Sequence, residues 1–398
     1  MNIVLHTHPA FLGSHSMTHL ARMLLDAYQA RGHQVVLRQP EAVVHRRVPK
    51  GRLSKWAGYI DQYLLFPRQM RAAMRFDPPD TLYVFCDQAL GPWVPQVAHR
   101  PHVVHCLDLL ALRSALGDIP ENPTSVTGRI YQRYIRRGFR QARHFISISQ
   151  KSQADLHRFG GVEPITSEVI YLGLNHPYRP LSAEQAQQRL RRAGLPAEEQ
   201  GCLLHIGGGQ WYKNSVGVVW LYASYVEMTV RAGAQPLPLW MVSPPPSPQL
   251  QAAIAQIPPA GRVRFFSGLG NDVLEALYSH AEALLFPSLA EGFGWPIVEA
   301  MACGCPVLTT GDAPMTEVGG DAASYLPRLA NAGELDAWAQ AGALQLWGVL
   351  GRTPAERDRA AASGRAWAAR FSADAAIDNH LSVYQRVLAL AAADKQAA

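Results

Sequence analysis

Short runs of apolar and β-branched residues recur along the chain, separated by longer segments in which apolar residues are spaced as in helices. The first series of runs reads NIVLHT, HQVVLRQ, TLYVFC, PHVVHCL, HFISIS and SEVIYLG, and a second series reads CLLHIG, PLWMVS, VRFFSG, ALLFPS and PVLTT. Short strands alternating with longer helices are typical of βαβ units and parallel sheets. The pattern therefore predicts an α/β protein with two doubly wound domains.

Two prolines interrupt this pattern in LNHPYRPLSAEQ (residues 174–185), before a polar segment with helical spacing. We therefore predict an N-terminal domain at 1–178 and a C-terminal domain at 179–375. A helix at about 376–398 is expected to pack back on the first domain. A chain of 398 residues, 48% of them hydrophobic, can form two such cores.

Composition favours a soluble protein of the reducing cytoplasm. No apolar run approaches the roughly 20 residues that span a bilayer, and the start NIVLHTHPAF does not resemble a secretory signal. The five cysteines are odd in number and lack C-x-x-C spacing, so we expect neither a disulfide framework nor a zinc site.

Positive charge is concentrated in the N-terminal half. Residues 1–180 contain 22 Lys and Arg against 12 Asp and Glu, whereas the rest of the chain contains 15 against 19. Basic residues alternate with aromatic and apolar ones in HRRVPKGRLSKWAGYIDQYLLFPRQMRAAMRF (45–76) and TGRIYQRYIRRGFRQARHF (127–145). Such segments suit an anionic membrane surface or a phosphate-bearing acceptor, although helices with solvated basic faces would show the same pattern. No recognition module accompanies the charge, so nucleic acid is not an expected partner.

Ligands of open parallel sheets bind beyond the carboxyl ends of the strands, so the loops after strands are the places to seek chemistry. The first such loop holds Gly13 before a helix, where backbone amides can approach an anion. The same segment contains His6, His8, His15 and His19, a spacing that could bind a metal. No carboxylate or cysteine cluster supports that alternative, and no metal is expected.

The loop after the fourth run contains His105 and Asp108. A histidine at the end of a strand with an aspartate nearby can orient a substrate hydroxyl or act as an acid or base, which makes His105 a candidate catalytic residue. A histidine whose hydrogen bonds are satisfied in the core would give the same sequence, and both interpretations stay open.

The segment CLLHIGGGQWYKNS places three glycines after a strand, and Lys213 and Asn214 then open a helix. Glycines such as Gly208 remove side chains from a turn that a diphosphate must approach, and a lysine supplies the compensating charge. A tight turn alone would explain the glycines, but the lysine at the start of the next helix favours phosphate binding.

A third glycine-containing turn stands in SLAEGFGWPIVEAMACGCPV (288–307). Pro296 lies near the first turn of the predicted helix and Gly304 lies at its end. The amides of Phe293, Gly294 and Trp295 are expected to point out of the helix N-terminus toward phosphate oxygens.

Glu291 precedes this predicted helix and Glu299 lies within it, so the two carboxylates cannot form a close acid and base pair. A carboxylate accepts hydrogen bonds from paired hydroxyls, which sugars and riboses offer. We therefore interpret the two glutamates as contacts to separate parts of one extended ligand. A capping glutamate beside a solvated one would not explain the glycines.

The combination EGFGWPIVEAMACGCPVLTT, followed by PMTEVGG, resembles glycosyltransferase family 4, the group 1 retaining nucleotide-sugar transferases of the GT-B fold. The likeness continues in VRFFSGLGNDVLEALYSHAEALLFPS, HIGGGQWYKN and FISISQKSQADLHRFGGVEPITSEVIYLGLN. The resemblance implies two facing Rossmann-like domains with an interdomain cleft, the acceptor in the first domain and the donor in the second.

The same resemblance assigns roles to individual residues. Glu291 is similar to the glutamate that contacts the donor sugar, and Glu299 to the one that holds the ribose. Lys213 is similar to the basic residue whose positive charge offsets the charge on the leaving nucleotide. The remaining expected donor contacts are Gly13, Gly208, Asn214, Ser267, Gly292, Phe293, Gly294 and Trp295.

Two positions depart from the family pattern. Gly208 stands where many relatives have an arginine, so phosphate neutralisation rests more heavily on Lys213. Leu107 precedes Asp108 where relatives often have histidine, which leaves the acceptor side without its usual pair. His105 is the candidate on this side.

The implied activity is retaining transfer of a hexose to a hydroxyl of a glycan or lipid-linked acceptor, in bacterial surface polysaccharide synthesis. The acceptor attacks the face from which the nucleotide leaves, with no protein nucleophile and no metal or other cofactor. GDP-mannose is the expected donor, and a UDP sugar is the alternative. The expected location is the cytoplasm, including the inner face of the plasma membrane.

Other functions share parts of this pattern. A GT-B epimerase or phosphorylase would act on the donor alone or require free phosphate. A two-domain sugar-binding protein would also have two α/β domains, but would carry an export signal. A metal hydrolase built on the N-terminal histidines would lose activity in EDTA.

Overall fold

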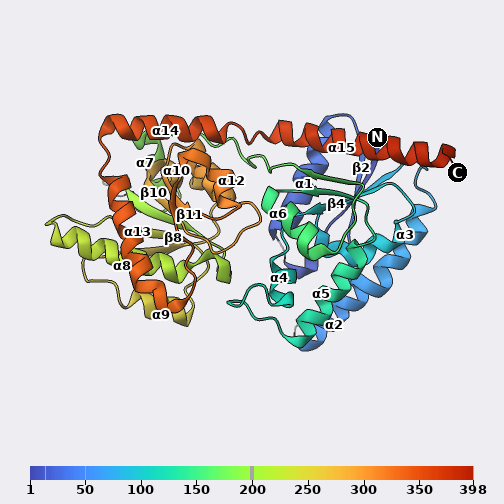
Figure 1. Ribbon diagram of the computed structural model, residues 1–398, viewed down its shortest axis with the longest axis horizontal. Coiled ribbons are helices and arrows are strands. Elements are labelled where there is room, and N and C mark those ends of the chain that lie inside the picture. The colour runs from blue at the N-terminus through green and yellow to red at the C-terminus, as the bar shows by residue number, and fades with distance from the viewer. Residues whose placement is uncertain (14, 50, 198–200, 398) are drawn as a thin grey trace. The chain divides into compact units, whose positions relative to one another are not determined.

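The computed structural model describes residues 1–13, 15–49, 51–197 and 201–397. The chain forms two compact units (Figure 1). Unit 1 comprises Met1–Gly173 together with the segment from Ala373 onward, and unit 2 comprises Leu174–Ser372. Each unit contains one parallel sheet flanked by helices.

The sheet of unit 1 has the strand order β2-β1-β3-β4-β5-β6, and every pair of neighbours is parallel. Its strands are β1 (Asn2–His6), β2 (Gln34–Arg38), β3 (Leu82–Phe85), β4 (His102–Cys106), β5 (His144–Ser147) and β6 (Thr166–Val169). Its helices include α1 (His15–Ala30), α2 (Arg52–Ile60), the π-helical turn η3 (Asp61–Leu65), α3 (Phe66–Met74), η4 (Gln88–Gln96), α4 (Leu110–Leu116), α5 (Val126–Phe139), α6 (Gln150–Asp155), η5 (Leu156–Gly160) and α15 (Ala373–Ala397).

The sheet of unit 2 is also parallel and has the order β12-β11-β10-β7-β8-β9. Its strands are β7 (Cys202–Ile206), β8 (Leu239–Val242), β9 (Val263–Phe266), β10 (Ala281–Phe286), β11 (Val307–Thr310) and β12 (Ser324–Leu326). Its helices include α7 (Ala183–Arg192), η6 (Trp211–Lys213), α8 (Ser215–Arg231), α9 (Pro248–Ile254), α10 (Asn271–His280), α11 (Trp295–Ala302), α12 (Met315–Gly319), α13 (Leu335–Leu350) and α14 (Pro354–Ala368).

The structure confirms the doubly wound α/β fold class, and β1 to β11 coincide with the predicted strand runs. Central strands such as β3, β4 and β5 are buried along their whole length, because helices cover both faces of a parallel sheet. The sequence pattern missed β12, which has only the three residues Ser324–Leu326 and lies at a sheet edge.

The C-terminal helix α15 belongs to unit 1 and is held there by a buried polar network. Tyr28 of α1 shares hydrogen bonds with His380 (3.1 Å) and Tyr384 (3.0 Å) of α15. Arg31 adds ion pairs with Asp374 and Asp378 at the edge of the same contact. Paired buried polar groups of this kind fix the packing of the helix in one register.

Each strand order contains one point at which the chain reverses its direction across the sheet. In unit 1 this switch point lies between β1 and β3, and in unit 2 it lies between β7 and β10. The loops that leave the two central strands diverge there, which opens a crevice at the carboxyl edge where ligands of such sheets bind. The loops after these four strands are therefore the places to examine.

Candidate donor site and its surroundings

The loops after β7 and β10 are tied together at the switch point of unit 2. Asn214 donates from Nδ2 to the Pro287 carbonyl at 3.0 Å, and the Leu289 amide donates to the Tyr212 carbonyl at 2.7 Å. Asn214 has a left-handed backbone with φ of 54°, a conformation that asparagine tolerates better than most residues. These bonds fix the position of the side chain between them, Lys213.

Lys213 forms an ion pair with Glu291, with 2.7 Å between Nζ and Oε1. The side chains are 14% and 8% exposed, so water screens the pair only partly. The ammonium also lies 4.8 Å from the ring centroid of Phe286, the last residue of β10. The fold thus brings together two predicted site residues that lie 78 positions apart in the sequence.

The N-terminus of α11 contacts the same phenylalanine. Gly294 precedes the helix with φ of 106°, a backbone that side chains rarely allow, and a Cβ there would lie 3.8 Å from Phe286 Cε1. The residue that precedes α11 and the Lys213 ammonium therefore both lie near the Phe286 side chain, which brings the positive end of the helix dipole close to the lysine. Two sources of positive potential at one place suit an anion such as a diphosphate. Gly292, Phe293 and Trp295 lie in or next to this turn.

Glu299 lies one turn into α11 and is only 6% exposed. Tyr278 of α10 donates from Oη to Glu299 Oε2 at 2.7 Å. Burial raises the pKa of Glu299 to about 7, although this hydrogen bond and the charge of Lys213 act to lower it. The carboxyl group is thus held in one orientation, close to half ionised at neutral pH.

The glycines after β7 leave room for the lysine. A Cβ on Gly207 would lie 2.9 Å from His205 Nε2 and 3.2 Å from Lys213 Cβ, so a larger residue would displace one of them. His205 itself is buried with its pKa lowered to about 4, and Nδ1 donates to the Leu285 carbonyl of β10 at 2.9 Å. The sequence pattern gave no sign of this link across the switch point. Gly208 is exposed in the same loop.

Ser267 is the predicted donor contact that unit 2 does not bring to this cluster. It is exposed directly after β9, and two strand spacings, about 10 Å, separate β9 from β7. It shares the carboxyl edge of the sheet with Lys213, but lies beyond hydrogen-bond reach of the ion pair.

Unit 1 contains the two remaining predicted residues. Gly13 follows a short 3-10 turn with φ of 68°, a backbone conformation that favours glycine, and no protein atom lies within 4 Å of where its Cβ would be. His105 is 2% exposed, and its Nε2 shares a 2.7 Å hydrogen bond with Tyr384 of α15. Burial lowers its pKa to about 4. This burial and this hydrogen bond favour the interpretation of His105 as a core histidine over its interpretation as a catalytic group.

A different histidine and aspartate meet at the switch point of unit 1. His8, after β1, donates from Nε2 to Asp87 Oδ2 at 2.8 Å, and Asp87 follows β3. Asp87 Oδ1 accepts the Ala89 amide at 2.9 Å, which fixes the carboxylate. In a neutral His8 the bond to Asp87 leaves Nδ1 as an acceptor. In the sequence, the histidine spacing offers His8 only as a metal ligand, because nothing in the sequence relates it to a residue 79 positions away.

The other histidine of the H-x-H pair is enclosed by aromatic rings. His6 is fully buried, 5.0 Å from the ring centroid of Phe85 and 5.9 Å from that of Phe66, and burial lowers its pKa to about 3. Across the residues that the structure describes, no three His, Cys, Asp or Glu side chains gather as a metal site. In the same described part, no helix is long and apolar enough to cross a membrane.

Two family models match the chain. Residues 202–344 match the model described as "Glycosyl transferases group 1", and residues 17–173 match the one described as "Glycosyl transferase 4-like domain". The first match begins at β7 and covers the loops of Lys213 and Glu291.

Among curated proteins, the chain is similar to O-antigen chain mannosyltransferase B of Escherichia coli, with 27% identity over 194 residues, 49% of this chain and 50% of that protein. It is also similar to MMP alpha-(1->4)-mannosyltransferase of Mycolicibacterium hassiacum, with 33% identity over 152 residues, 37% of this chain and 35% of that protein. The matched region thus spans about half the length of the first relative and about a third of the second.

Among solved structures, Anabaena Alr3699/HepE in complex with UDP matches with a TM-score of 0.67 and 16% identity, over 96% of this chain and 98% of that one. A likeness at this identity shows the fold. The fold is the GT-B type, built from two Rossmann-like α/β units.

Proposed function

Because the chain belongs to the group 1 glycosyltransferases, we propose that it transfers a hexose from a nucleoside-diphosphate sugar to a hydroxyl of a glycan or lipid-linked acceptor. One observation supports the donor site above all others. Lys213, Glu291 and the N-terminus of α11 meet at the switch point of unit 2, with Glu299 in the same helix. Positive potential for a diphosphate and carboxylates for hydroxyls thus occur in one place.

In the proposed complex each group contacts a different part of the donor. The diphosphate lies against the Lys213 ammonium and the N-terminus of α11, where the helix dipole favours negative charge. The ribose hydroxyls donate to Glu299, whose second oxygen is held by Tyr278. Glu291 keeps one oxygen on Lys213 and offers the other to the hexose. Gly208 and Asn214 shape the loop around the phosphates.

The reaction follows from the same groups. The bond from the anomeric carbon to the leaving phosphate breaks, its electron pair goes to the phosphate oxygen, and the acceptor oxygen bonds to the same face of the carbon. The acceptor proton passes to the leaving phosphate. Lys213 and the α11 dipole stabilise the negative charge that develops on the diphosphate, so the reaction requires neither a protein nucleophile nor a metal. We expect transfer to persist in EDTA.

Mannose from GDP-mannose is the proposed donor, because both relatives described above are mannosyltransferases by name. The name of the first also supports a role in bacterial surface polysaccharide synthesis. The UDP complex of HepE favours a UDP sugar as the second candidate.

A thermal-shift series with GDP, UDP, ADP and the corresponding sugars tests the donor. A nucleotide present at about 100 times its Kd stabilises the folded protein by about 2.7 kcal/mol, which raises the Tm by roughly 5–11 °C for a domain of this size. We expect GDP and GDP-mannose to give the largest shifts. Larger Tm shifts with UDP and a UDP sugar would contradict GDP-mannose as the donor and favour the UDP sugar. The absence of a shift with any nucleotide would contradict the donor site itself.

His8 and Asp87 are proposed to orient the acceptor hydroxyl, because Nδ1 of His8 can accept a hydrogen bond from that hydroxyl while Asp87 holds the ring. Replacing His8 with Phe keeps the ring but removes both nitrogens. We expect kcat/KM for the acceptor to fall by about 100-fold, with the nucleotide-induced Tm shift unchanged. The exposed His99 gives the matched control, and His99→Phe should behave as wild type. An unaltered acceptor kcat/KM in His8→Phe would exclude this role.

A further inference from the structure

Helices α2 and α5 of unit 1 expose apolar side chains that a soluble surface rarely gathers. On α5, Val126, Ile130 and Tyr134 recur every four residues, and so lie on one face of the helix, with Val126 71% exposed. On α2, Leu53 and Trp56 are 71% and 65% exposed. Contiguous exposed apolar surface marks a site of interaction.

A cavity of about 760 Å³ lies among these elements and η3. This volume is within the range of pockets that hold small molecules. One cation, Lys55, lines the cavity. The aromatic residues that line it are Trp56, Tyr59, Tyr63, Tyr131 and Tyr134. The cavity is therefore open to the same apolar surface that Trp56 and Tyr134 form.

Four of the hydroxyl groups that line this pocket pair with one another. Tyr63 and Tyr131 share a hydrogen bond of 2.5 Å between their hydroxyls, and the Ser125 and Thr127 hydroxyls lie 3.2 Å apart. Tyr59 stacks on Tyr131 with 5.6 Å between ring centroids. Burial raises the pKa of Tyr63 and of Tyr131 above the usual value. Such a lining favours an apolar occupant over a sugar, which needs hydrogen-bonding groups directed at it.

The charge around the pocket is positive. Arg129, Arg133 and Arg137 follow the exposed apolar residues of α5 at the same four-residue spacing, and α2 and α5 contain no Asp or Glu. The acid that directly follows α2, Asp61, is buried and accepts the Val44 and His45 amides. Lys55 lies 5.8 Å from the ring centroid of Tyr59, one of the residues that line the pocket.

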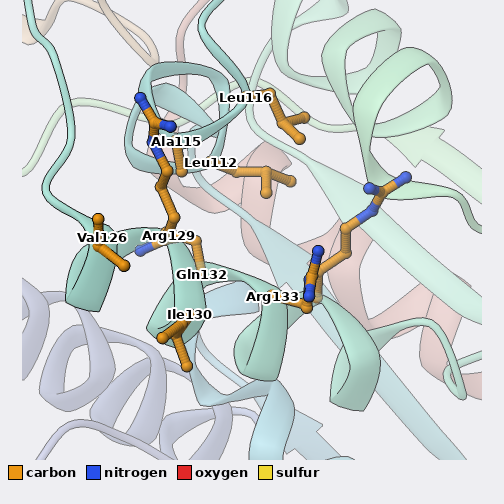
Figure 2. Close-up of a pocket in the computed structure, with 9 residues that line it drawn as sticks. Leu112, Ala115, Leu116, Val126, Arg129, Ile130, Gln132 and Arg133 are labelled. Atoms are coloured by element: carbon orange, nitrogen blue, oxygen red, sulfur yellow. The ribbon is translucent and has the colours of Figure 1, made fainter.

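The side of α5 that faces α4 continues this pattern. Figure 2 shows Arg129 and Arg133 beside Val126 and Ile130 at a second cavity, of about 290 Å³, that α5 forms with Leu112 and its neighbours on α4. Cations next to exposed apolar side chains are the combination that binds the interface of an anionic lipid layer.

We propose that the pocket between α2, η3 and α5 binds the apolar chain of a phosphate-headed lipid, with the phosphate at Lys55. The chain contacts the rings of Tyr59, Tyr131 and Tyr134, and the arginines of α5 contact neighbouring anionic head groups. This inference rests on the proposed function, where the lipid is the anchor of a lipid-linked acceptor.

The test uses single lipids below their critical micelle concentration. Farnesyl phosphate and a lysophosphatidic acid represent isoprenyl and acyl chains, and farnesol and inorganic phosphate represent the chain and the head alone. Binding to the full-length protein is measured by titration calorimetry without any sugar donor. Thr127→Trp places an indole at the pocket, and Lys55→Glu reverses the charge; both positions are exposed. The controls are Gln132→Trp on the other side of α5 and Lys395→Glu on α15.

We expect at least one lipid phosphate to bind the wild type more tightly than farnesol or inorganic phosphate. Its Kd should rise at least tenfold in Thr127→Trp and in Lys55→Glu, and stay within twofold in the controls. Unchanged lipid binding in Thr127→Trp would contradict the proposal that this pocket binds the lipid chain. Binding to anionic vesicles without binding of single lipids would contradict it as well. Because the nucleotide-induced Tm shift is measured on the same samples, loss of lipid binding alone is distinguished from failure of the proposed transferase.

Discussion

Replacing Glu299 with alanine is expected to lower kcat/KM for the donor by at least 100-fold. The change removes the carboxylate proposed to hold the ribose and leaves Tyr278 Oη without its acceptor inside the protein. Loss of the charge-assisted hydrogen bonds to the ribose accounts for about 3 kcal/mol of this effect. Steady-state kinetics at saturating acceptor measure the effect. Glu227→Ala on α8 is the matched control, because Glu227 is exposed.

The pH dependence gives a second signature of Glu299. Ribose hydroxyls donate to the ionised carboxylate, so binding favours the deprotonated form. With a pKa of about 7, roughly one tenth of the group is ionised at pH 6 and nine tenths at pH 8. Affinity for a nucleoside-diphosphate sugar should therefore rise about tenfold between these pH values. Glu299→Gln keeps the side-chain volume and should remove this rise, whereas an equally steep rise in the variant would exclude Glu299 as its source.

Replacing Lys213 with methionine is the second large change. The variant keeps the apolar stem against Phe286 and removes the charge that stabilises the departing diphosphate. Because that charge develops in the transition state, we expect kcat to fall by about 10²–10³-fold, with a smaller effect on nucleotide affinity.

Single-turnover measurements separate the chemical step of Lys213→Met from donor binding. Loss of Lys213 also leaves Glu291 without its ion-pair partner, so the Tm of the variant is measured in parallel. Lys395→Met on α15 is the control for the same chemical change. A variant with wild-type kcat would show that the α11 N-terminus stabilises the leaving group without the lysine.

The strands of both sheets could be predicted because burial imposes its pattern on the local sequence. The strand residues in runs such as TLYVFC and ALLFPS are almost all apolar or aromatic, since helices cover both faces of the strands. The edge strand β12 escaped prediction, because three residues are too few to show a period. The role of His105 could not be predicted either. A histidine near the end of a strand gives the same sequence pattern whether its side chain faces a ligand or Tyr384.

The loops of the proposed donor site are marked in the sequence by glycines and charges next to strands, which are local features. Their geometry is not local. The Lys213–Glu291 ion pair, the Tyr278–Glu299 hydrogen bond and the His8–Asp87 pair each join residues from separate elements. The strand order decides which loops meet at a switch point, and no spacing along the chain encodes it. Hence the sequence indicated the loops that hold Lys213, Glu291 and Glu299, whereas the pairing of His8 with Asp87 emerged only from the structure.

A crystal structure with the preferred nucleoside diphosphate tests the central claim most directly. The diphosphate should lie against Lys213 Nζ and the N-terminus of α11, and the ribose hydroxyls should lie within hydrogen-bond distance of Glu299. A nucleotide bound at the β9 edge near Ser267, or in unit 1, with Lys213 and Glu299 left uncontacted, would contradict it.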